Sequence, residues 1–199
     1  MKGIVYTLGG KVYDFLDERF EKNRYARIRG KILPKLGGKI LDAGCGTGRN
    51  FHYYSKSADM LAIDNSEPML EKARERAKGL DNIEIKNMSV TQIKVPDNSV
   101  DVVLLNGVLE WVGTLNKGLS PQQIQIQALR EIKRILKPNG RLYIGIENRF
   151  GYGYFFGGKD HSGLPFTSIM PRFLANIFCY IFKKKPYRTY TYTSKGYTN

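Results

Sequence analysis

A short apolar segment that runs directly into alternating glycines constrains this chain most strongly. Residues 39–43 read as a short strand, and glycines then occupy every second position from Gly44 to Gly48. Glycine adopts positive φ without steric cost and lets a backbone approach a ligand closely. Such a loop at the carboxyl end of a strand typically delivers a ligand to the amino end of the next helix. We therefore expect a ligand-binding loop, with a helix beginning near Gly48.

The rest of the chain alternates predicted strands with predicted helices. Strands are predicted at 60–64, 83–87, 100–106 and 141–146, and helices between Ser66 and Gly79 and from Ser120, where a capping box begins, to Leu136. The alternation implies parallel pairing with right-handed crossovers. The predicted fold is a single α/β domain: a doubly wound, Rossmann-like, mainly parallel sheet with helices on both faces.

Within this single domain we distinguish three segments. They are a helical preamble at 1–38, a ligand-binding core at 39–148, and a C-terminal segment at 149–199. In the preamble a helix is predicted at 12–23, and helical spacing continues through Tyr25, Ile28 and Ile32 until Pro34. The C-terminal segment holds 14 aromatic residues and no acidic residue after Asp160, so its composition differs from that of the core. We expect it to face the substrate or to complete the sheet.

The net charge of +14 is concentrated in two stretches, 22–39 and 159–199. Such basic clusters favour a polyanionic partner, either RNA or an anionic membrane surface. The alternative is a solvated surface that aids solubility.

Other features of the sequence indicate the cellular setting. The chain has no apolar run long enough to span a bilayer, and its start does not read as a signal peptide. Cys45 and Cys179 lie far apart and suggest no disulfide framework. His52 and His161 stand alone, so no metal site is predicted. We expect a cytoplasmic protein, peripheral at the membrane if the basic clusters bind lipid.

Further motifs follow the glycine loop at ordered spacing. Asp64 ends the second strand, where a carboxylate can accept both hydroxyls of a ribose. The turn at 96–99 precedes the fourth strand, and residues 137–140 lead into the fifth. A nicotinamide dinucleotide site would place its third glycine one residue later than Gly48. Asp42, before the loop, also disfavours a dinucleotide site.

This ordered set resembles the class I S-adenosylmethionine-dependent methyltransferases over residues 39–148. The resemblance implies S-adenosylmethionine as the cofactor. The implied cofactor-binding residues are Asp42, Gly44, Cys45, Gly46, Gly48, Asp64, Asn65, Met69, Ser89, Val90 and Asn106. Asp42 and the glycines would lie near the methionine part, and Asp64 would bind the ribose. Many family members carry an acidic residue where Ser89 aligns, and Ser89 can accept the same hydrogen bond without charge.

The reaction that the resemblance implies is an in-line displacement of a methyl group from a sulfonium. Alignment of the reactants alone can supply roughly 7–11 kcal/mol, so no catalytic dyad is required. An oxygen acceptor would still gain from a general base. The candidates are Glu110 and His161, and Glu147 is equally a candidate structural anchor. No sequence argument separates the three.

A narrower resemblance concerns the acceptor. Residues 106–112, 147–151, 163–166 and 187–192 look like a group of microbial methyltransferases associated with cell-surface glycan or lipopolysaccharide assembly. This implies a small-molecule or glycan acceptor such as a sugar hydroxyl. An RNA methyltransferase that uses the basic clusters is an alternative, although the chain has no separate RNA-binding module. A non-catalytic module that binds the cofactor or a partner is another.

The C-terminal segment departs from the resemblance, because the fold normally ends in an antiparallel hairpin. A helix at 171–182 and one strand at 187–193 are predicted, and the last strand has no obvious place. The helix carries an apolar stripe that either packs on the sheet or contacts an anionic, partly apolar partner. The stripe consists of Phe173, Leu174, Ile177, Phe178, Ile181 and Phe182. Lys183, Lys184 and Lys185 follow it directly.

Overall fold

The structure is a computed structural model that describes residues 25–115, 118–193 and 195–196. The helix predicted at 12–23 lies outside these residues. Internal contacts divide the chain into two compact units. The first unit runs to Asn106 and also contains Arg130–Ile144, and the second contains Gly107–Leu129 and the chain from Gly145 onward. Each unit has a hydrophobic cluster of its own.

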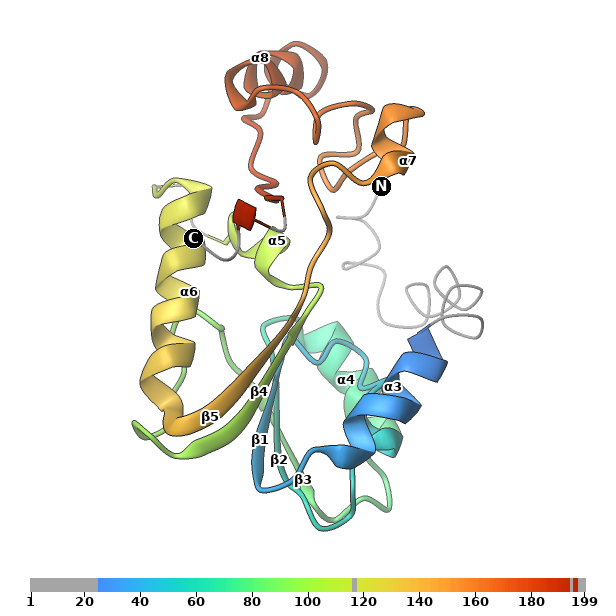
Figure 1. Cartoon of the computed structure of the whole chain (residues 1–199), viewed down its shortest axis with the longest axis vertical. Coiled ribbons are helices and arrows are strands. Elements are labelled where there is room, and N and C mark those ends of the chain that lie inside the picture. The colour runs from blue at the N-terminus through green and yellow to red at the C-terminus, as the bar shows by residue number, and fades with distance from the viewer. Residues whose placement is uncertain (1–24, 116–117, 194, 197–199) are drawn as a thin grey trace. The chain divides into compact units, whose positions relative to one another are not determined.

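Five strands form one sheet with the order β3-β2-β1-β4-β5 (Figure 1). They are β1 (Lys39–Ala43), β2 (Asp59–Asp64), β3 (Ile83–Asn87), β4 (Val100–Asn106) and β5 (Leu136–Gly145). The pairs β1–β2, β2–β3 and β1–β4 are parallel. The chain builds outward from β1 to β3 and then returns to place β4 on the other side of β1. This order confirms the predicted doubly wound, mainly parallel sheet.

Both faces of the central strands are buried. Ile40 and Leu41 are neighbours in β1 and point to opposite faces, yet both are 0% exposed. On the face of Ile40, the 3-10 helix η2 (Leu33–Lys35) packs through Leu33, and α4 (Glu67–Arg76) packs through Leu70. Burial on both faces is typical of a parallel sheet between helical layers.

Two further helices were anticipated by the sequence. α3 (Ala26–Ile32) precedes η2, and α6 (Pro121–Ile135) leads into β5. The capping box forms, because Ser120 N–H donates to Gln123 Oε1 (2.8 Å) and Gln123 N–H donates to Ser120 Oγ (3.2 Å).

The helix predicted near Gly48 is wrong. Only a three-residue 3-10 helix, η3 (Phe51–Tyr53), follows the glycine loop. Gly48 has a φ of +78°, which an α-helix does not accommodate. Asn50 then turns its side chain inward to the carboxylate of Asp42. The loop therefore does not deliver its ligand to the amino end of an α-helix.

The second unit contains α5 (Leu109–Val112), α7 (Tyr152–Phe155) and α8 (Arg172–Lys183). α8 corresponds to the helix predicted at 171–182. Its cluster joins Ala175 and Cys179 of α8 to Tyr187. No helix among the described residues is long and apolar enough to cross a membrane.

The strand predicted at 187–193 is wrong. Tyr192 makes only an isolated parallel bridge to Asn148. The guanidinium of Arg172 lies over the rings of Tyr190 and Tyr192, at 3.8 and 4.6 Å from their centroids. Gln125 Nε2 donates to the Tyr190 carbonyl at 2.7 Å. A side chain thus occupies a backbone carbonyl that would otherwise pair with a neighbouring strand. In the described residues no strand follows β5.

Candidate functional site

Residues at the carboxyl ends of four parallel strands form the first candidate site, within the first unit. Parallel strands place their carboxyl ends at the same edge of a sheet, where ligands of doubly wound folds bind. The strands end at Ala43, Asp64, Asn87 and Asn106. Ten of the eleven residues that the resemblance assigns to the cofactor lie in these strands or within a few residues of their ends, and Met69 lies in the first turn of α4.

The glycine loop is fixed by its backbone. Gly44 and Cys45 N–H both donate to the Ile63 carbonyl, at 2.7 and 2.9 Å. The φ values of Gly44, Gly46 and Gly48 are +77°, +57° and +78°, which explains the alternating glycines. A Cβ added to Gly46 would meet no atom within 4 Å, so the loop is open beside this residue. The loop therefore offers bare backbone to a ligand.

Asp42 is a buried carboxylate at this edge, with 2% of its surface exposed. Its Oδ2 accepts hydrogen bonds from Asn50 Nδ2 (2.8 Å) and Tyr54 Oη (3.0 Å). Burial raises the pKa of Asp42 from 3.8 to about 6, against the lowering by these two donors and by the charge of Arg29. A buried carboxylate of this kind favours a cationic ligand that would restore its charge.

Asp64 connects the second strand to the glycine loop. Its Oδ2 accepts from Gly46 N–H and its Oδ1 from Ser66 N–H, both at 2.9 Å. Burial raises its pKa, against the lowering by these backbone donors. Each carboxylate oxygen can accept a second hydrogen bond, so Asp64 can bind ligand hydroxyls while it holds the loop.

The remaining predicted cofactor residues differ in exposure. Met69 (1% exposed) and Val90 (6%) are buried, whereas Asn65 and Asn106 are exposed. Ser89 Oγ shares a hydrogen bond with Thr91 Oγ1 at 2.8 Å and accepts from the Thr91 N–H at 3.3 Å. Burial raises the pKa of the Cys45 thiol above its usual range. The thiol therefore stays protonated, and Cys45 lines the glycine loop rather than acting as a nucleophile.

The second candidate site lies within the second unit and unites the three residues that the sequence could not separate. His161 Nε2 lies 3.7 Å from Glu110 Oε1 and 3.4 Å from Glu147 Oε2. The side chains of Glu110 and His161 are 3% and 6% exposed, whereas that of Glu147 is 38% exposed. Glu110 Oε2 is buried and has no hydrogen-bond partner among the described residues. The cluster therefore runs from a buried carboxylate with a vacant acceptor to one that reaches solvent.

Two aromatic residues complete this cluster. The Trp111 ring lies 4.0 Å from the His161 ring between centroids, tilted by 35°. Tyr154 Oη donates to Glu147 Oε2 at 2.6 Å. Burial and the neighbouring Glu147 raise the pKa of Tyr154, so its hydroxyl remains a donor. These contacts hold the imidazole and the outer carboxylate in place.

Sequence reasoning missed the residues that position the functional groups. Asn50 and Tyr54 hold Asp42, and Trp111 and Tyr154 contact His161 and Glu147 of the second candidate site. The signal for Asn50 and Tyr54 is their spacing, since they follow Asp42 by eight and twelve residues in one short loop. No local signal marks Tyr154, because its partner is set by the tertiary fold.

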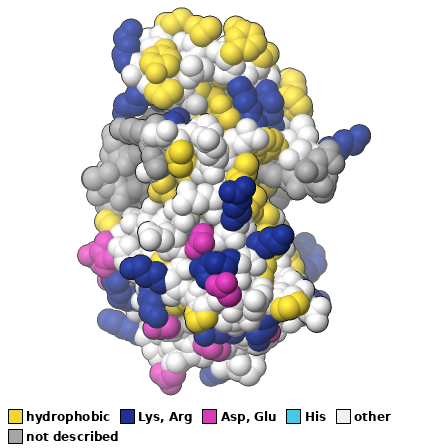
Figure 2. Space-filling view, turned by 90° about the vertical axis from the view of Figure 1, so that its left-hand side faces the viewer, with side chains coloured by type: hydrophobic (Ala, Val, Ile, Leu, Met, Phe, Trp, Pro, Cys, Tyr) yellow, Lys and Arg dark blue, Asp and Glu magenta, His cyan; other side chains and the backbone are white. Residues whose placement is uncertain are grey.

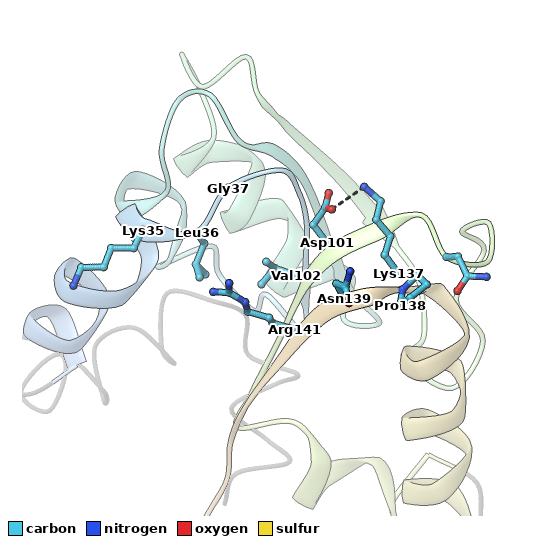
Figure 3. A pocket seen from close by; sticks show the side chains of 10 residues that line it. Lys35, Leu36, Gly37, Asp101, Val102, Lys137, Pro138, Asn139 and Arg141 are labelled. Atoms are coloured by element: carbon cyan, nitrogen blue, oxygen red, sulfur yellow. Dashed lines mark hydrogen bonds and ion pairs between the residues drawn. The ribbon is translucent and has the colours of Figure 1, made fainter.

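A cavity of about 700 Å³ lies at the opposite edge of the sheet, by the amino ends of β1, β4 and β5 (Figure 3). Asp101 there pairs with Lys137 at 2.7 Å and accepts the Lys39 N–H at 2.8 Å. Lys137 and the Lys39 N–H lower the pKa of Asp101. We place the candidate ligand site at the carboxyl edge, because ligands of doubly wound folds bind there and because Asp101, the one carboxylate among the described residues that line this cavity, already pairs with Lys137.

A match to a known family shows to which family the chain belongs. Residues 41–144 match a family described as a methyltransferase domain. The chain belongs to this methyltransferase family. The match covers β1 to β5, including the glycine loop and Asp64, and confirms the resemblance to the class I S-adenosylmethionine-dependent methyltransferases.

Several relatives of this methyltransferase share part of its length. Demethylmenaquinone methyltransferase of Clavibacter sepedonicus is 35% identical over 114 residues, which are 57% of this chain and 42% of the relative. The chain spans about half the length of the curated relatives it matches.

Solved structures show the same fold. A protein of Methanococcus maripaludis, assigned as a candidate S-adenosyl-L-methionine-dependent methyltransferase, is 26% identical with a TM-score of 0.54, over 71% of this chain and 66% of that protein. A SAM-dependent methyltransferase of Aquifex aeolicus is 24% identical with a TM-score of 0.56, over 84% of each chain. The second likeness supports the fold alone.

Proposed function

We propose that this methyltransferase binds S-adenosylmethionine at the carboxyl edge of its sheet and methylates a hydroxyl of a small molecule, with Glu110 as the general base. The vacant, buried Glu110 Oε2 beside His161 is the observation that carries the proposal. Relatives named as demethylmenaquinone methyltransferases support a small-molecule acceptor. A glycan hydroxyl, which the narrower resemblance implies, would require the same chemistry.

The residues of the first unit fit this cofactor. Asp42 and Asp64 supply negative charge for a cationic ligand and acceptors for ribose hydroxyls. The open backbone beside Gly46 leaves room for a ligand that a side chain would exclude. An α-helix amino terminus, which favours phosphate, is absent after the loop in the described residues. The donor set thus suits a sulfonium nucleoside better than a pyrophosphate.

When bound, S-adenosylmethionine supplies a methyl group on a positively charged sulfur, which leaves as a neutral thioether. As the oxygen of the acceptor hydroxyl bonds to the methyl carbon, Glu110 Oε2 accepts the proton of that hydroxyl. The leaving group requires no proton, so one base is sufficient.

His161 and Glu147 carry the proton away from Glu110. The same ring nitrogen, Nε2, lies near both carboxylates, so a small tilt of the ring passes a proton from Glu110 to Glu147. The distances of 3.7 and 3.4 Å must shorten for this transfer, as is common when catalytic hydrogen bonds tighten on substrate binding. Two carboxylates also stabilise the imidazolium that forms. Because Glu147 is 38% exposed, it releases the proton to solvent.

The acceptor class is tested by incubating the protein with radiolabelled S-adenosylmethionine and fractionated cell extract. We expect label in a small-molecule or glycan fraction, in a product that resists mild alkali as a methyl ether does. An alkali-labile product would indicate a methylated carboxylate and would overturn the hydroxyl assignment. Label in an RNase-sensitive fraction would overturn the small-molecule acceptor.

The role of Glu110 is tested with Glu110→Gln, which keeps the shape and removes the base. We expect turnover to fall by about 10²-fold or more, while cofactor affinity measured by calorimetry is unchanged. Glu71→Gln, at an exposed position of α4, removes the same charge and serves as the control. Full activity of Glu110→Gln across the pH range would show that alignment alone drives the reaction.

A further inference from the structure

The apolar stripe of α8 faces outward instead of packing against a core. Of the predicted stripe, Phe173 (66%), Ile177 (52%), Ile181 (58%) and Phe182 (62%) are all strongly exposed. These four side chains therefore pack against no core within the second unit. Such a large contiguous apolar surface normally marks a binding site.

The inner side of α8 explains this orientation. Ala175 and Cys179, at 0% and 3% exposure, are the residues through which the helix packs on Tyr187. They are small, so the helix lies close to the unit and turns its large side chains away. Arg172 is held on the same inner side by the rings of Tyr190 and Tyr192. The exposed side of α8, which carries Phe173, Ile177, Ile181 and Phe182, is thus fixed by contacts within the second unit. We call this side the outward arc.

Basic residues border the outward arc. Lys183 ends the helix, and Lys184 and Lys185 follow; all three are exposed. Lys184 is the residue that caps the end of the helix, and its φ of +55° turns the chain sharply. Between His161 and the end of the sequence no acidic residue occurs to neutralise these charges. At the top of the view in Figure 2, where Figure 1 draws α8, apolar side chains gather with Lys and Arg side chains beside them.

We propose that α8 and the three lysines after it form a docking surface for an anionic lipid membrane. An amphipathic helix with apolar bulk on one side and lysines at its border lies in the plane of a bilayer surface, and anionic headgroups attract the lysines. At 12 residues α8 is about 18 Å long, too short to span the hydrocarbon core. A protein partner fits less well, because lysine is depleted in protein–protein interfaces. RNA would leave the apolar arc without a role.

Exposed aromatic residues of α7 occur in the same unit. Tyr152 and Phe155 are 83% and 56% exposed, and Phe156, directly after the helix, is 86% exposed. Aromatic side chains are favoured at the level of lipid headgroups. These exposed aromatic side chains would suit a lipid surface as the α8 side chains do. The proposal rests on α8 itself.

The test is co-sedimentation of the full chain with vesicles of phosphatidylcholine alone and of phosphatidylcholine with phosphatidylglycerol. We expect binding to the mixed vesicles, at least about tenfold weaker partition onto the neutral ones, and weaker binding at high salt. The assay needs neither cofactor nor acceptor. Its outcome is therefore independent of the proposed methyl transfer.

Two variants separate the apolar and the basic parts of the surface. Ile181→Glu should weaken binding about tenfold, and Ile126→Glu, an equally drastic change at an exposed position of α6 (41% exposed), should not. Lys183/Lys184/Lys185→Glu should weaken binding at least about tenfold. Lys56/Lys78/Lys133→Glu changes the net charge equally at exposed positions elsewhere and should bind more tightly than the α8 triple variant. Circular dichroism and thermal unfolding confirm that each variant folds.

Three outcomes would overturn the proposal. The first is failure of the unmodified protein to bind mixed vesicles at low salt. The second is self-association, measured by analytical ultracentrifugation, that Ile181→Glu abolishes while no vesicle binding occurs. The third is binding of RNA without binding of vesicles, lost in the Lys183/Lys184/Lys185→Glu variant.

Discussion

The two candidate sites are built in opposite ways. In the first unit, Asp42, the glycine loop and Asp64 lie within 23 residues of sequence and are joined mainly by backbone hydrogen bonds. In the second unit, Glu110, Glu147 and His161 come from separate segments and meet through side chains alone. A site made of backbone tolerates few changes of conformation, whereas a site made of side chains depends on the packing that holds each one.

The largest effect is expected in the side-chain site. His161→Asn should lower turnover by about 10²-fold or more, because Glu110 then loses the group that takes up its proton. Cofactor affinity should not change. His52→Asn is the control, since His52 is the other histidine of the chain and is exposed. Steady-state kinetics and calorimetry measure the two quantities.

The coupling of the side-chain site is tested by combining two changes. If His161 and Glu147 act in one proton path, Glu147→Gln should add little to the loss already caused by His161→Asn. Multiplicative losses in the double variant would show that the two residues act independently, and the proposed path would fail.

The backbone site is tested by two glycine substitutions. Gly48→Ala should reduce the free energy of unfolding by about 2–4 kcal/mol, because its φ is +78° and its Cβ would lie 2.6 Å from the Phe51 ring. Gly46→Ala has similar φ strain but an open neighbourhood, so it should cost only about 1 kcal/mol. It should instead weaken cofactor binding, since its methyl group occupies the open side of the loop. Equal destabilisation by the two changes would contradict the steric assignment.

Features marked by local signals could be predicted from the sequence, whereas features set by the tertiary fold could not. Glycines at alternate positions and Asp64 at a strand end are local signals, so the fold could be predicted, and these residues do lie at the carboxyl ends of the strands. The meeting of Glu110 with His161 and Glu147 depends on how segments more than thirty residues apart fold together, which no periodicity encodes. The stripe of α8 was visible in the sequence, but its outward direction was not. That direction is set by the small Ala175 and Cys179 on the other side of the helix.

The free-energy cost of burying the Asp42 carboxylate can be measured through the pH dependence of stability. Its folded pKa of about 6 exceeds the unfolded 3.8, so the folded state holds this proton more tightly. The stability that this proton contributes is therefore complete below pH 3.8 and is lost as the pH rises through about 6. Asp42→Asn removes the cost of the buried charge and should gain up to about 3 kcal/mol of unfolding free energy above this pH. The gain should vanish towards pH 4 and should be accompanied by weaker cofactor binding, measured by chemical denaturation and calorimetry. A constant stability difference across this range would contradict the assignment.

A modest effect on cofactor binding is expected at Asp64, whose carboxylate holds the loop and is proposed to bind the ligand. Asp64→Ala should weaken cofactor binding by roughly 1–3 kcal/mol, because the ribose hydroxyls lose a charged acceptor. It also removes the acceptor of Gly46 N–H and Ser66 N–H, so part of this loss comes from a looser loop. Asp64→Asn separates the two contributions in part, since its amide oxygen can still accept from Gly46 N–H, whereas its NH₂ group can accept neither from Ser66 N–H nor from a hydroxyl. If Asp64→Asn binds the cofactor as tightly as the unmodified protein and Asp64→Ala does not, Asp64 acts only through the loop. If both variants bind weakly and Asp64→Asn unfolds at the same temperature as the unmodified protein, the carboxylate contacts the ligand directly.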